Sequence, residues 1–522
     1  MFALVHILSI LSFGLVCASQ GNDDPVVVGL TFLAESTDPS EGSTPWALTS
    51  HGIAEKLFTV DKNGNIVGQL ATSVAKVSDF VWDVTIQPDS KFSDGTPVSS
   101  EAVAFSLMEQ NNKNPSAQSS LGNMTVVALD DTTVRIESER QTHMMDAVLA
   151  EWAFVIYSKA SDGNFVFTGP FAIAVFEAEQ IHLVPNEYYL GATVRSSVLI
   201  KKFEDGHDLA TAFKDDKVDI AFQLPIDTLP DLRKEKGARI KSFEVGYHYM
   251  MFYNMETLED VRIRKAIDLA IDRNTVSQAL AGGKGTRSLF PDNSPFFSDD
   301  SEAGGDPDAA SKLLEEAGWA LNTSGKRAKD GKELTVQLVA YPHRPGLLIS
   351  QKVIAETLTA LGISVTTIVT GQDWSETEQV INDRSFDLLM WAQHTLPAGD
   401  PLWFLTTFFR SDGSNNHAHI NSTTIDLYVD MLSRSEGHDE RVMLSQTIQD
   451  FILEAVPVSN LVTPFWHVGL SERAADYEPW GSDYYVIRSD LSVAPGEVSG
   501  GQRSAAAQGL LIICATFMVV ML

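Results

Sequence analysis

Cysteine is almost absent from this chain of 522 residues, which contains only two. Both, Cys17 and Cys514, lie in apolar segments at the ends that we expect to be removed during maturation. The mature chain would then have no disulfide, no thiolate nucleophile and no cysteine-ligated metal. This composition excludes disulfide-rich scaffolds and cysteine-dependent enzymes.

The chain is also poor in basic residues. Lys and Arg number 38 against 69 Asp and Glu, which gives a formal net charge of -31. Such a surface repels phosphate backbones, so we expect no nucleic-acid partner, and the charge indicates a solvated acidic surface. With 44% hydrophobic and 20% charged residues, the composition is that of a globular protein. The length allows about two to four domains.

Recognised catalytic motifs are missing as well. The chain has no G-x-S-x-G, H-E-x-x-H, C-x-x-C, Walker or G-x-G-x-x-G motif. Residues 61–65 lack the closing Glu of a calcium loop, so we predict a hairpin turn there. We expect the histidines of the predicted loops to lie at the surface rather than to bind metal; they are His343, His394, His417 and His419. We therefore expect neither an enzyme nor a cofactor or metal site.

The two ends have the character of targeting signals. Residues 1–18 form an apolar run followed by small residues, which predicts a secretory signal peptide. The apolar tail 509–522 is too short to span a bilayer comfortably, since about 20 residues are needed. Small residues at 499–501, within a linker at 496–508, indicate a glycolipid (GPI) attachment signal; the alternative is a retained C-terminal anchor. Candidate glycosylation sites are Asn123, Asn322 and Asn421.

Local patterns in the first half of the chain predict alternating strands and helices. Phe80, Trp82, Val84 and Ile86 would share one face of a half-buried strand. In the stretch KFSDGTPVSSEAVAFSL, residues 91–107, the pair Asp-Gly predicts a turn and the serine before the last helical run predicts an N-cap. No base adjoins these serines in sequence, so we interpret the stretch as structural rather than nucleophilic.

The second half predicts an α/β layer. Asp260 is expected to cap a helix through residues 261–273, and Asp306 with Pro307 to start another. Between residues 333 and 393 the order of patterns is strand, helix, strand, helix, strand. This order predicts a βαβαβ unit and a mainly parallel sheet.

Eight sequence motifs occur in one order over residues 27 to about 490. They are EKLFTVDKNGNIVGQLATS (55–73), KFSDGTPVSSEAVAFSL (91–107), TGPF (168–171), FKDDKVDIAF (213–222), VRIRKAIDLAIDR (261–273), DPDAASKLLEEAGW (306–319), LGISV (361–365) and AGDP (398–401). Together they resemble the family 5 extracellular solute-binding proteins, the oligopeptide, dipeptide and nickel receptors of ABC importers. Phe171 stands where that family usually has Tyr, and Gly68-Gln69 where it usually has a proline.

The resemblance implies an α/β fold of the type II periplasmic-binding-protein kind, with two lobes, a hinge and an additional inserted domain. Lobe I would comprise residues 24–45, 166–255 and 466–495. The inserted domain II would comprise 46–165, and lobe II 256–465.

The resemblance also implies which residues contact the solute. Asp400, in the AGDP motif, would hold the α-ammonium of a peptide; the alternative is a turn acid before Pro401. Arg344 lies near the arginine that dipeptide-binding members use for the ligand's carboxylate. Trp391 could line a side-chain pocket or belong to the core. Further cleft candidates by position are Gln393, His394, Glu35, Trp46 and Trp403.

The predicted function is the capture of short peptides in a cleft that closes about a hinge. The alternatives are nickel or metal-chelate binding within the same family, a secreted hydrolase, or a surface adhesion protein. We expect a monomer that is secreted or held at the cell surface through its C-terminal tail. The family implies a membrane permease as partner, whereas a glycolipid signal implies a eukaryotic cell, where such importers are not expected; in a prokaryote the compartment would be equivalent to the periplasm.

Overall fold

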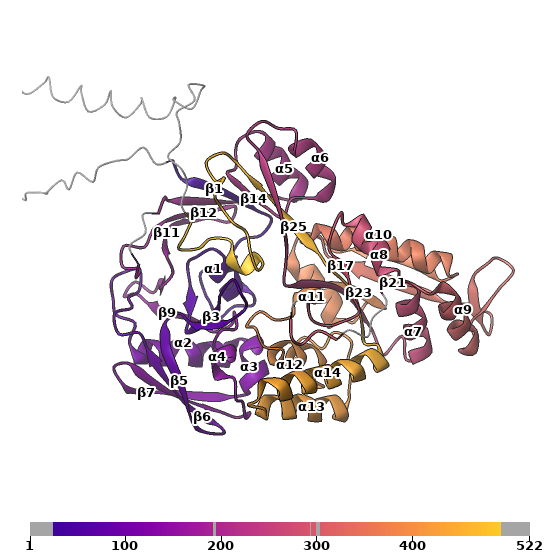
Figure 1. Cartoon of the computed structure of the whole chain (residues 1–522), viewed down its shortest axis with the longest axis horizontal. Helices are drawn as coiled ribbons and strands as arrows, with labels where there is room; N and C mark the ends of the chain where they lie inside the picture. Colours follow the sequence, from indigo (N-terminus) through magenta and orange to yellow (C-terminus); the bar gives the residue numbers. More distant parts are fainter. Residues whose placement is uncertain (1–23, 192–194, 293, 299–302, 492–522) are drawn as a thin grey trace, which may run out of the picture.

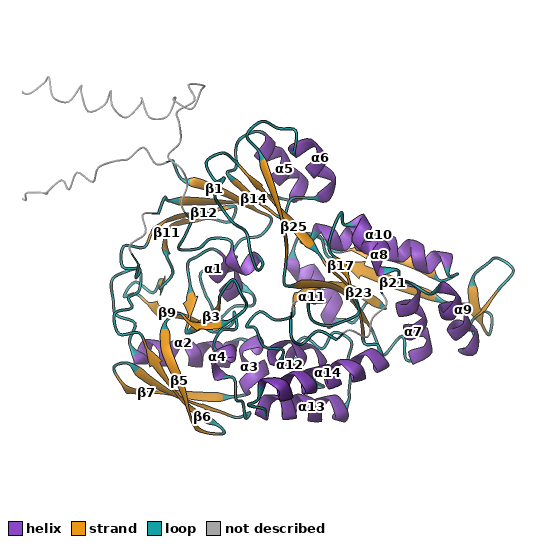
Figure 2. Cartoon of the chain, viewed as in Figure 1, coloured by secondary structure: helices purple, strands orange, loops and turns teal. Residues whose placement is uncertain are grey.

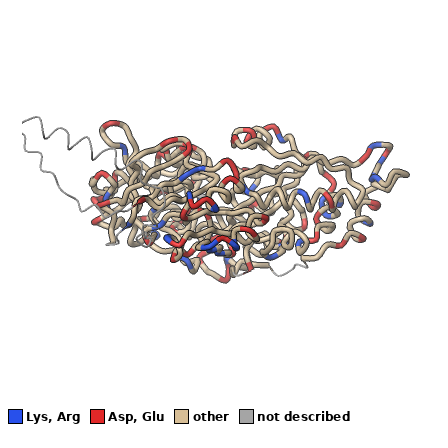
Figure 3. Tube along the Cα trace, turned by 90° about the horizontal axis from the view of Figure 1, so that it is seen from above, with Lys and Arg blue, Asp and Glu red and all other residues tan. Residues whose placement is uncertain are grey.

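The computed structural model describes residues 24–191, 195–292, 294–298 and 303–491. Two large sheets and one smaller sheet organise the molecule, with helices packed around them (Figures 1 and 2). The fold is the two-lobed α/β arrangement with an additional domain that the sequence predicts. Acidic positions occur along the whole length of the chain trace rather than in one patch (Figure 3), in keeping with the net charge of -31.

The seven-stranded sheet of the first lobe gathers strands from three separate parts of the chain. Its order is β11-β12-β13-β1-β14-β25-β15, and β1 pairs in parallel with β13 and β14. Its strands are β1 (Val26–Leu30), β11 (Phe171–Phe176), β12 (Gln180–Pro185), β13 (Val198–Lys202), β14 (Ile220–Phe222), β15 (Arg239–Glu244) and β25 (Phe465–Leu470). Helices α5 (Gly206–Lys214) and α6 (Leu229–Leu232) lie beside it, and α1 (Thr44–Ser50) packs against the 3₁₀ turn η2 (Asp483–Tyr485).

The six-stranded sheet of the second lobe confirms the predicted βαβαβ unit. The unit consists of β21 (Thr335–Ala340), α10 (Pro345–Ala360), β22 (Ser364–Val369), α11 (Trp374–Asn382) and β23 (Leu388–His394). β21 pairs in parallel with both β22 and β23. The remaining strands each pair antiparallel with their neighbours in the sheet; they are β16 (Tyr247–Tyr253), β17 (Lys284–Gly285) and β24 (Val458–Thr463). The predicted caps are also present, since Asp260 and Asp306 accept backbone N–H bonds at the starts of α7 (Val261–Ala270) and α9 (Pro307–Glu316).

Two chain crossings join the large sheets. The chain leaves the seven-stranded sheet after β15 and enters the six-stranded sheet as β16, through Val245 and Gly246. It returns from β24 to β25 through Pro464. Because β15 pairs with β25 and β16 with β24, the crossings form one paired ribbon. β16 thus belongs to the second sheet, although its residues fall in the range 166–255 that we expected for lobe I.

The additional domain is built on the four-stranded sheet β5-β6-β8-β7 and has its own hydrophobic core. Ser99 accepts a bond from Ala102 N and caps α2, and residues 61–65 form a hairpin turn, so both sequence predictions are confirmed. Phe80 does not join Trp82 on the buried face as predicted, because it lies in the turn before β6 and is 44% exposed. The domain's elements are β2 (Glu55–Lys56), β3 (Phe58–Val60), β4 (Ile66–Gly68), β5 (Ala71–Ser78), β6 (Val81–Ile86), α2 (Ser100–Lys113), α3 (Pro115–Leu121), β7 (Met124–Asp130), β8 (Thr133–Ser138), α4 (Met145–Val148), β9 (Val155–Lys159) and β10 (Phe165–Phe167).

This domain also contacts helices of the second lobe. Ser119 and Ser414 share a hydroxyl bond of 3.0 Å, and Arg140 donates to Asp412 at 3.0 Å. Figure 1 places α3 beside α12 at the bottom of the molecule. The remaining elements of the second lobe are α8 (Arg273–Ala279), β18 (Ala320–Leu321), β19 (Arg327–Lys329), β20 (Lys332–Glu333), α12 (Leu402–Phe409), α13 (Thr423–Arg434) and α14 (His438–Ala455).

The predicted signal peptide, linker and apolar tail lie outside the described residues. No helix within the described ranges is both long and apolar enough to cross a bilayer. Of the sequon asparagines, Asn123 and Asn421 are exposed and Asn322 is half-buried.

Candidate functional site

A buried ion pair joins the two lobes beside the crossing strands. Arg344, which precedes α10 of the second lobe, donates to Asp483 of the 3₁₀ turn η2 at 2.6 Å. Arg344 is 9% exposed and Asp483 is fully buried. The hydroxyl of Tyr247, in β16, donates to the other oxygen of Asp483 at 2.8 Å. Both partners of this carboxylate therefore belong to the second lobe, whereas Asp483 itself belongs to the first.

Aromatic rings surround the Arg344 guanidinium. Its central carbon lies 5.5–6.0 Å from the ring centres of Tyr247, Trp466, Trp46 and Phe32. Trp46 stacks on Phe32 at 4.6 Å between centroids. Since a cation over an aromatic face is attracted to the ring quadrupole, especially where water is excluded, these rings favour the charged guanidinium. We call Arg344, Asp483 and these four rings the interlobe site.

The electrostatics of the interlobe site keep its donors protonated. Burial lowers the pKa of Arg344, but the charge of Asp483 together with the neighbouring tyrosine hydroxyls outweighs burial, and the pKa is raised above its ordinary value. Burial raises the pKa of the Tyr247 hydroxyl well above its usual range, and the Asp483 charge adds to the rise. The Asp483 carboxylate thus has a charged guanidinium, from Arg344, on one oxygen and a protonated phenol, from Tyr247, on the other.

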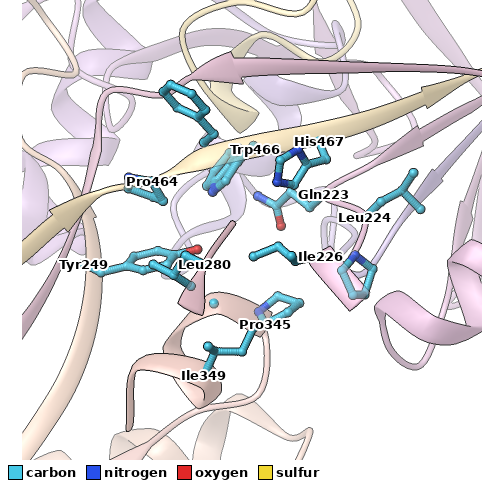
Figure 4. Close-up of a pocket in the computed structure, with 13 residues that line it drawn as sticks. Gln223, Leu224, Ile226, Tyr249, Leu280, Pro345, Ile349, Pro464, Trp466 and His467 are labelled. Atoms are coloured by element: carbon cyan, nitrogen blue, oxygen red, sulfur yellow. The ribbon is translucent and has the colours of Figure 1, made fainter. Parts of the chain in front are cut away.

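A cavity of about 30 Å³ lies next to this site, and Trp466 is one of the residues that line it (Figure 4). Its walls come from the loop after β14, the crossing strands and the start of α10. Most of its lining is apolar, but Gln223 and His467 also face it. A second cavity, of about 450 Å³, lies between the additional domain and helices α12 and α13, where Arg140 and Arg410 are already paired with acidic residues.

Three of the residues proposed from the sequence meet at the interlobe site: Arg344, Trp46 and His394. The ring of His394 lies 5.6 Å from that of Tyr247 and 5.5 Å from that of Tyr484, which follows Asp483. His394 also approaches Gly246 so closely that a Cβ there would lie 2.5 Å from the imidazole. The narrow crossing at Gly246 therefore places His394 against the site.

Asp400 lies elsewhere and is already engaged. It is 5% exposed, and both of its carboxylate oxygens accept bonds from Arg441, Nε at 2.8 Å and Nη2 at 2.5 Å. One oxygen also accepts from Leu402 N at the start of α12. A ligand ammonium would have to displace the guanidinium, so the amine-binding role of Asp400 stays a prediction and carries no part of our proposal.

The other proposed residues are distributed over different surroundings. Trp391 packs with His417 and Tyr341 at 4.5 and 5.4 Å, inside the aromatic core of the second lobe. Gln393 accepts a bond from Trp391 Nε1 at 3.3 Å. Trp403 is buried in α12, and Glu35 is exposed. Sequence reasoning missed Asp483, Tyr247, Trp466, Gln223 and His467, because no motif or periodicity distinguishes them before the crossing strands bring them together.

Two histidines that we expected at the surface are buried. His394 is 8% exposed because it ends β23 and packs against Tyr247 and Tyr484. His417 is 6% exposed because its loop packs it against Trp391 and Phe408. Burial lowers the pKa of each to about 3. In the described ranges, no group of three or more His, Cys, Asp and Glu side chains is arranged to hold a metal ion.

His417 allows a test of the cost of these buried imidazoles. The unfolded chain binds the His417 proton near pH 6.5, whereas the native state does so only near pH 3, so acidification favours unfolding. Replacing His417 with Phe should therefore reduce the loss of unfolding free energy between pH 6.5 and 5.5 by about 1 kcal/mol. Urea unfolding of both proteins at the two pH values measures this. An identical pH dependence for the variant and the natural protein would contradict the assignment.

Two lobes joined by a paired ribbon, with a charged and aromatic site at the junction, define a binding protein of the type II periplasmic class. The sequence profile described as bacterial extracellular solute-binding proteins, family 5 (middle region), matches residues 65–416. The chain belongs to this family.

Several similar proteins match nearly the whole chain. The nickel-binding protein NikA of Staphylococcus aureus is 24% identical over 484 residues, covering 90% of this chain and 94% of the relative. The crystal structure of NikA from Staphylococcus aureus in complex with Ni(L-His)2 superposes with a TM-score of 0.79 at 21% identity, covering 90% of this chain and 100% of the other. The oligopeptide-binding protein AppA of Bacillus subtilis, in complex with a nonapeptide, gives a TM-score of 0.74 at 20% identity, covering 88% and 96%.

Proposed function

We propose that this protein captures short peptides between its lobes, with Arg344 binding the solute's carboxylate and Asp483 its ammonium group. The observation that carries the proposal is the buried Arg344–Asp483 pair, whose partners come from different lobes. Opening the lobes about the crossing strands would separate the two charges. A solute that bears both opposite charges could then replace each partner on closure, so that neither charge is left buried alone.

The rings of the interlobe site suit such a ligand. Trp46 comes from α1, Phe32 from the loop after β1, and Trp466 from the crossing strand β25. Their faces can cover the apolar parts of a peptide while the charged ends reach Arg344 and Asp483. Because closure excludes water, each charged contact is strengthened.

A metal chelate is the second candidate ligand. The extensive similarity to a nickel-binding protein favours it. Arg344 would then bind a carboxylate of the chelator. We propose a receptor rather than an enzyme in either case, and support for this comes from the family, whose members are solute-binding proteins.

Binding of a random pool of short peptides tests the proposal. Native mass spectrometry of the protein with the pool should show retained peptides, and X-ray scattering should show a smaller radius of gyration on binding. Nickel with histidine serves as the parallel probe for the chelate. If the pool leaves both the mass and the radius unchanged, the peptide proposal is wrong; binding of nickel with histidine alone would favour the second candidate.

We further propose that the chain is secreted as a monomer and glycosylated, and that the C-terminal tail is exchanged for a glycolipid. The apolar ends, the small residues at 499–501 and the sequons support this. The mass of the mature protein, before and after treatment with a phosphatidylinositol-specific phospholipase, decides between this and a retained anchor. Transfer of the solute to a membrane permease would be expected only where the cell encodes one.

A further inference from the structure

The cavity beside the interlobe site contains polar groups that have no partner in the structure. Gln223 is only 6% exposed, so bulk water does not reach its side chain. Both polar atoms of its amide, Nε2 and Oε1, are nevertheless without a hydrogen bond in the structure. The Nε2 atom of His467 is also buried without a partner, and its Nδ1 shares a bond of 2.7 Å with the Ser242 hydroxyl. Buried polar atoms are nearly always satisfied in folded proteins, so unsatisfied atoms at a cavity indicate a missing partner.

The backbone holds Gln223 in an unfavourable conformation that directs its side chain into the cavity. Its φ angle is 67°, in the left-handed region that side chains other than glycine, asparagine and aspartate rarely adopt. The flanking residues fix this conformation, because Phe222 pairs with Val468 in the sheet and Leu224 N donates to His467 O at 2.8 Å. Figure 4 shows the amide lying in the space between Trp466, His467 and Ile226. Backbone strain of this kind is concentrated at functional sites.

The walls of the cavity determine which chemistry it accepts. None of the described residues that line it is Lys, Arg, Asp or Glu, and the walls include Leu224, Ile226, Leu280 and Ile349. Burial lowers the pKa of His467 to about 4, so its imidazole is neutral at neutral pH. A charged group would lose its hydration here without gaining a counter-charge. A neutral group that both donates and accepts would satisfy Gln223 and His467.

The cavity is within reach of a solute held at the interlobe site. Pro345, which lines it, is the residue next to Arg344. Trp466 also lines it, and the centre of the Trp466 ring lies 5.7 Å from the Arg344 guanidinium. The walls come from both lobes, so a movement of the lobes about the crossing strands would change the size of the cavity. Its volume of about 30 Å³ fits the end of a small polar side chain.

We propose that this cavity is a specificity pocket, in which Gln223 and His467 bind the carboxamide or hydroxyl of a solute side chain. The proposal rests on the proposed function, since it assigns the preferred class of peptide: one that bears Asn, Gln, Ser or Thr near the end held by Arg344. Leu, Asp or Lys at that position would leave the pocket's polar atoms unsatisfied or bring an unpaired charge.

Calorimetric titration with matched tripeptides tests this pocket. The probes are Ala-Ala-Ala and its derivatives with Asn, Gln, Ser, Leu, Asp or Lys placed in turn at each position. At one position, Asn or Gln should bind at least about tenfold more tightly than Leu, Asp or Lys, because only the former complete the hydrogen bonds. Gln223→Leu should abolish this preference, because the variant has no amide to bind the solute side chain.

A second variant guards against misfolding. Gln223→Gly removes the amide and relieves the strain, because glycine adopts the left-handed backbone readily, so this variant is expected to fold and to lose the same preference. If the tripeptides bind without any preference for a side chain, the specificity pocket is wrong. It is also wrong if the preference survives in both variants. The unsatisfied atoms of Gln223 and His467 would then be explained by an ordered water. Failure of every tripeptide, Ala-Ala-Ala included, would overturn the proposed function together with the pocket, so the two failures are distinguishable.

Discussion

Replacing Arg441 with Met is expected to lower the free energy of unfolding by about 3–5 kcal/mol. Arg441 is 2% exposed and holds both oxygens of the buried Asp400 carboxylate. It also donates to the carbonyls of Leu432 and Ser435, which tie α13 to α14. Without the guanidinium, Asp400 is a buried charge with no counter-charge. Denaturant unfolding followed by circular dichroism measures the loss.

Two controls separate the buried charge from the loss of a long side chain. Arg262→Met removes a half-exposed pair with Asp260 and should cost no more than about 1 kcal/mol. Asp400→Asn combined with Arg441→Met leaves neither charge and should be more stable than Arg441→Met alone. If Arg441→Met is as stable as Arg262→Met or more stable, the structural role that we assign to the Arg441–Asp400 pair is wrong.

The same residues distinguish the two roles of Asp400. If Asp400 binds the peptide ammonium, Asp400→Asn should weaken peptide affinity without changing the stability of the protein. A carboxylate that holds Arg441 and the start of α12 requires lower stability and unchanged affinity, and this is the result we expect. Titration with Ala-Ala-Ala, together with the unfolding curve of this variant, provides both quantities.

Replacing Arg344 with Met is expected to weaken the affinity for Ala-Ala-Ala about 10- to 150-fold. The proposed contact is a hydrogen-bonded pair with a charged carboxylate, and the loss of such a bond costs about 1.5–3 kcal/mol. Burial increases the effect, because the solute's carboxylate would then lack a counter-charge in a site closed by aromatic rings. Calorimetric titration measures the change in Kd.

Arg344→Met also leaves Asp483 without its cation, so the control must address folding. Arg384→Met makes the same substitution at an exposed pair with Glu256 and should leave the affinity unchanged. Arg344→Met with Asp483→Asn removes both buried charges and should fold, yet still bind poorly, since the solute loses both partners. If Arg344→Met binds Ala-Ala-Ala with unchanged affinity, Arg344 does not bind the solute's carboxylate.

Much of the local structure could be predicted from the sequence, because it depends on neighbouring residues. Ser99, Asp260 and Asp306 cap their helices as expected, since a cap needs only a side-chain oxygen near the first backbone N–H groups. The order of patterns between 333 and 393 indicated the parallel strands correctly. Phe80 shows the limit of this reasoning, because the alternation of apolar and polar residues begins one residue before the strand does.

The candidate site was predicted only where a motif pointed to it. Arg344 could be proposed from its place before a helix, but its partner Asp483 follows it by 139 residues and lies in a stretch without recognisable pattern. Asp400 shows the converse, since a motif residue proved to be held by Arg441, another residue far away in the chain. Partners across such distances in sequence leave no local signal.

The sequence by itself determined the class of this protein, because the motifs, caps and hydrophobic alternation act over a few residues and set each element and its family. Only the tertiary structure decided which side chains face each other between the lobes. The crossings at Gly246 and Pro464 bring Arg344, Asp483, Gln223 and His467 to one junction. Burial there, rather than residue type, turns an ion pair and an unsatisfied amide into the groups that we propose recognise the solute.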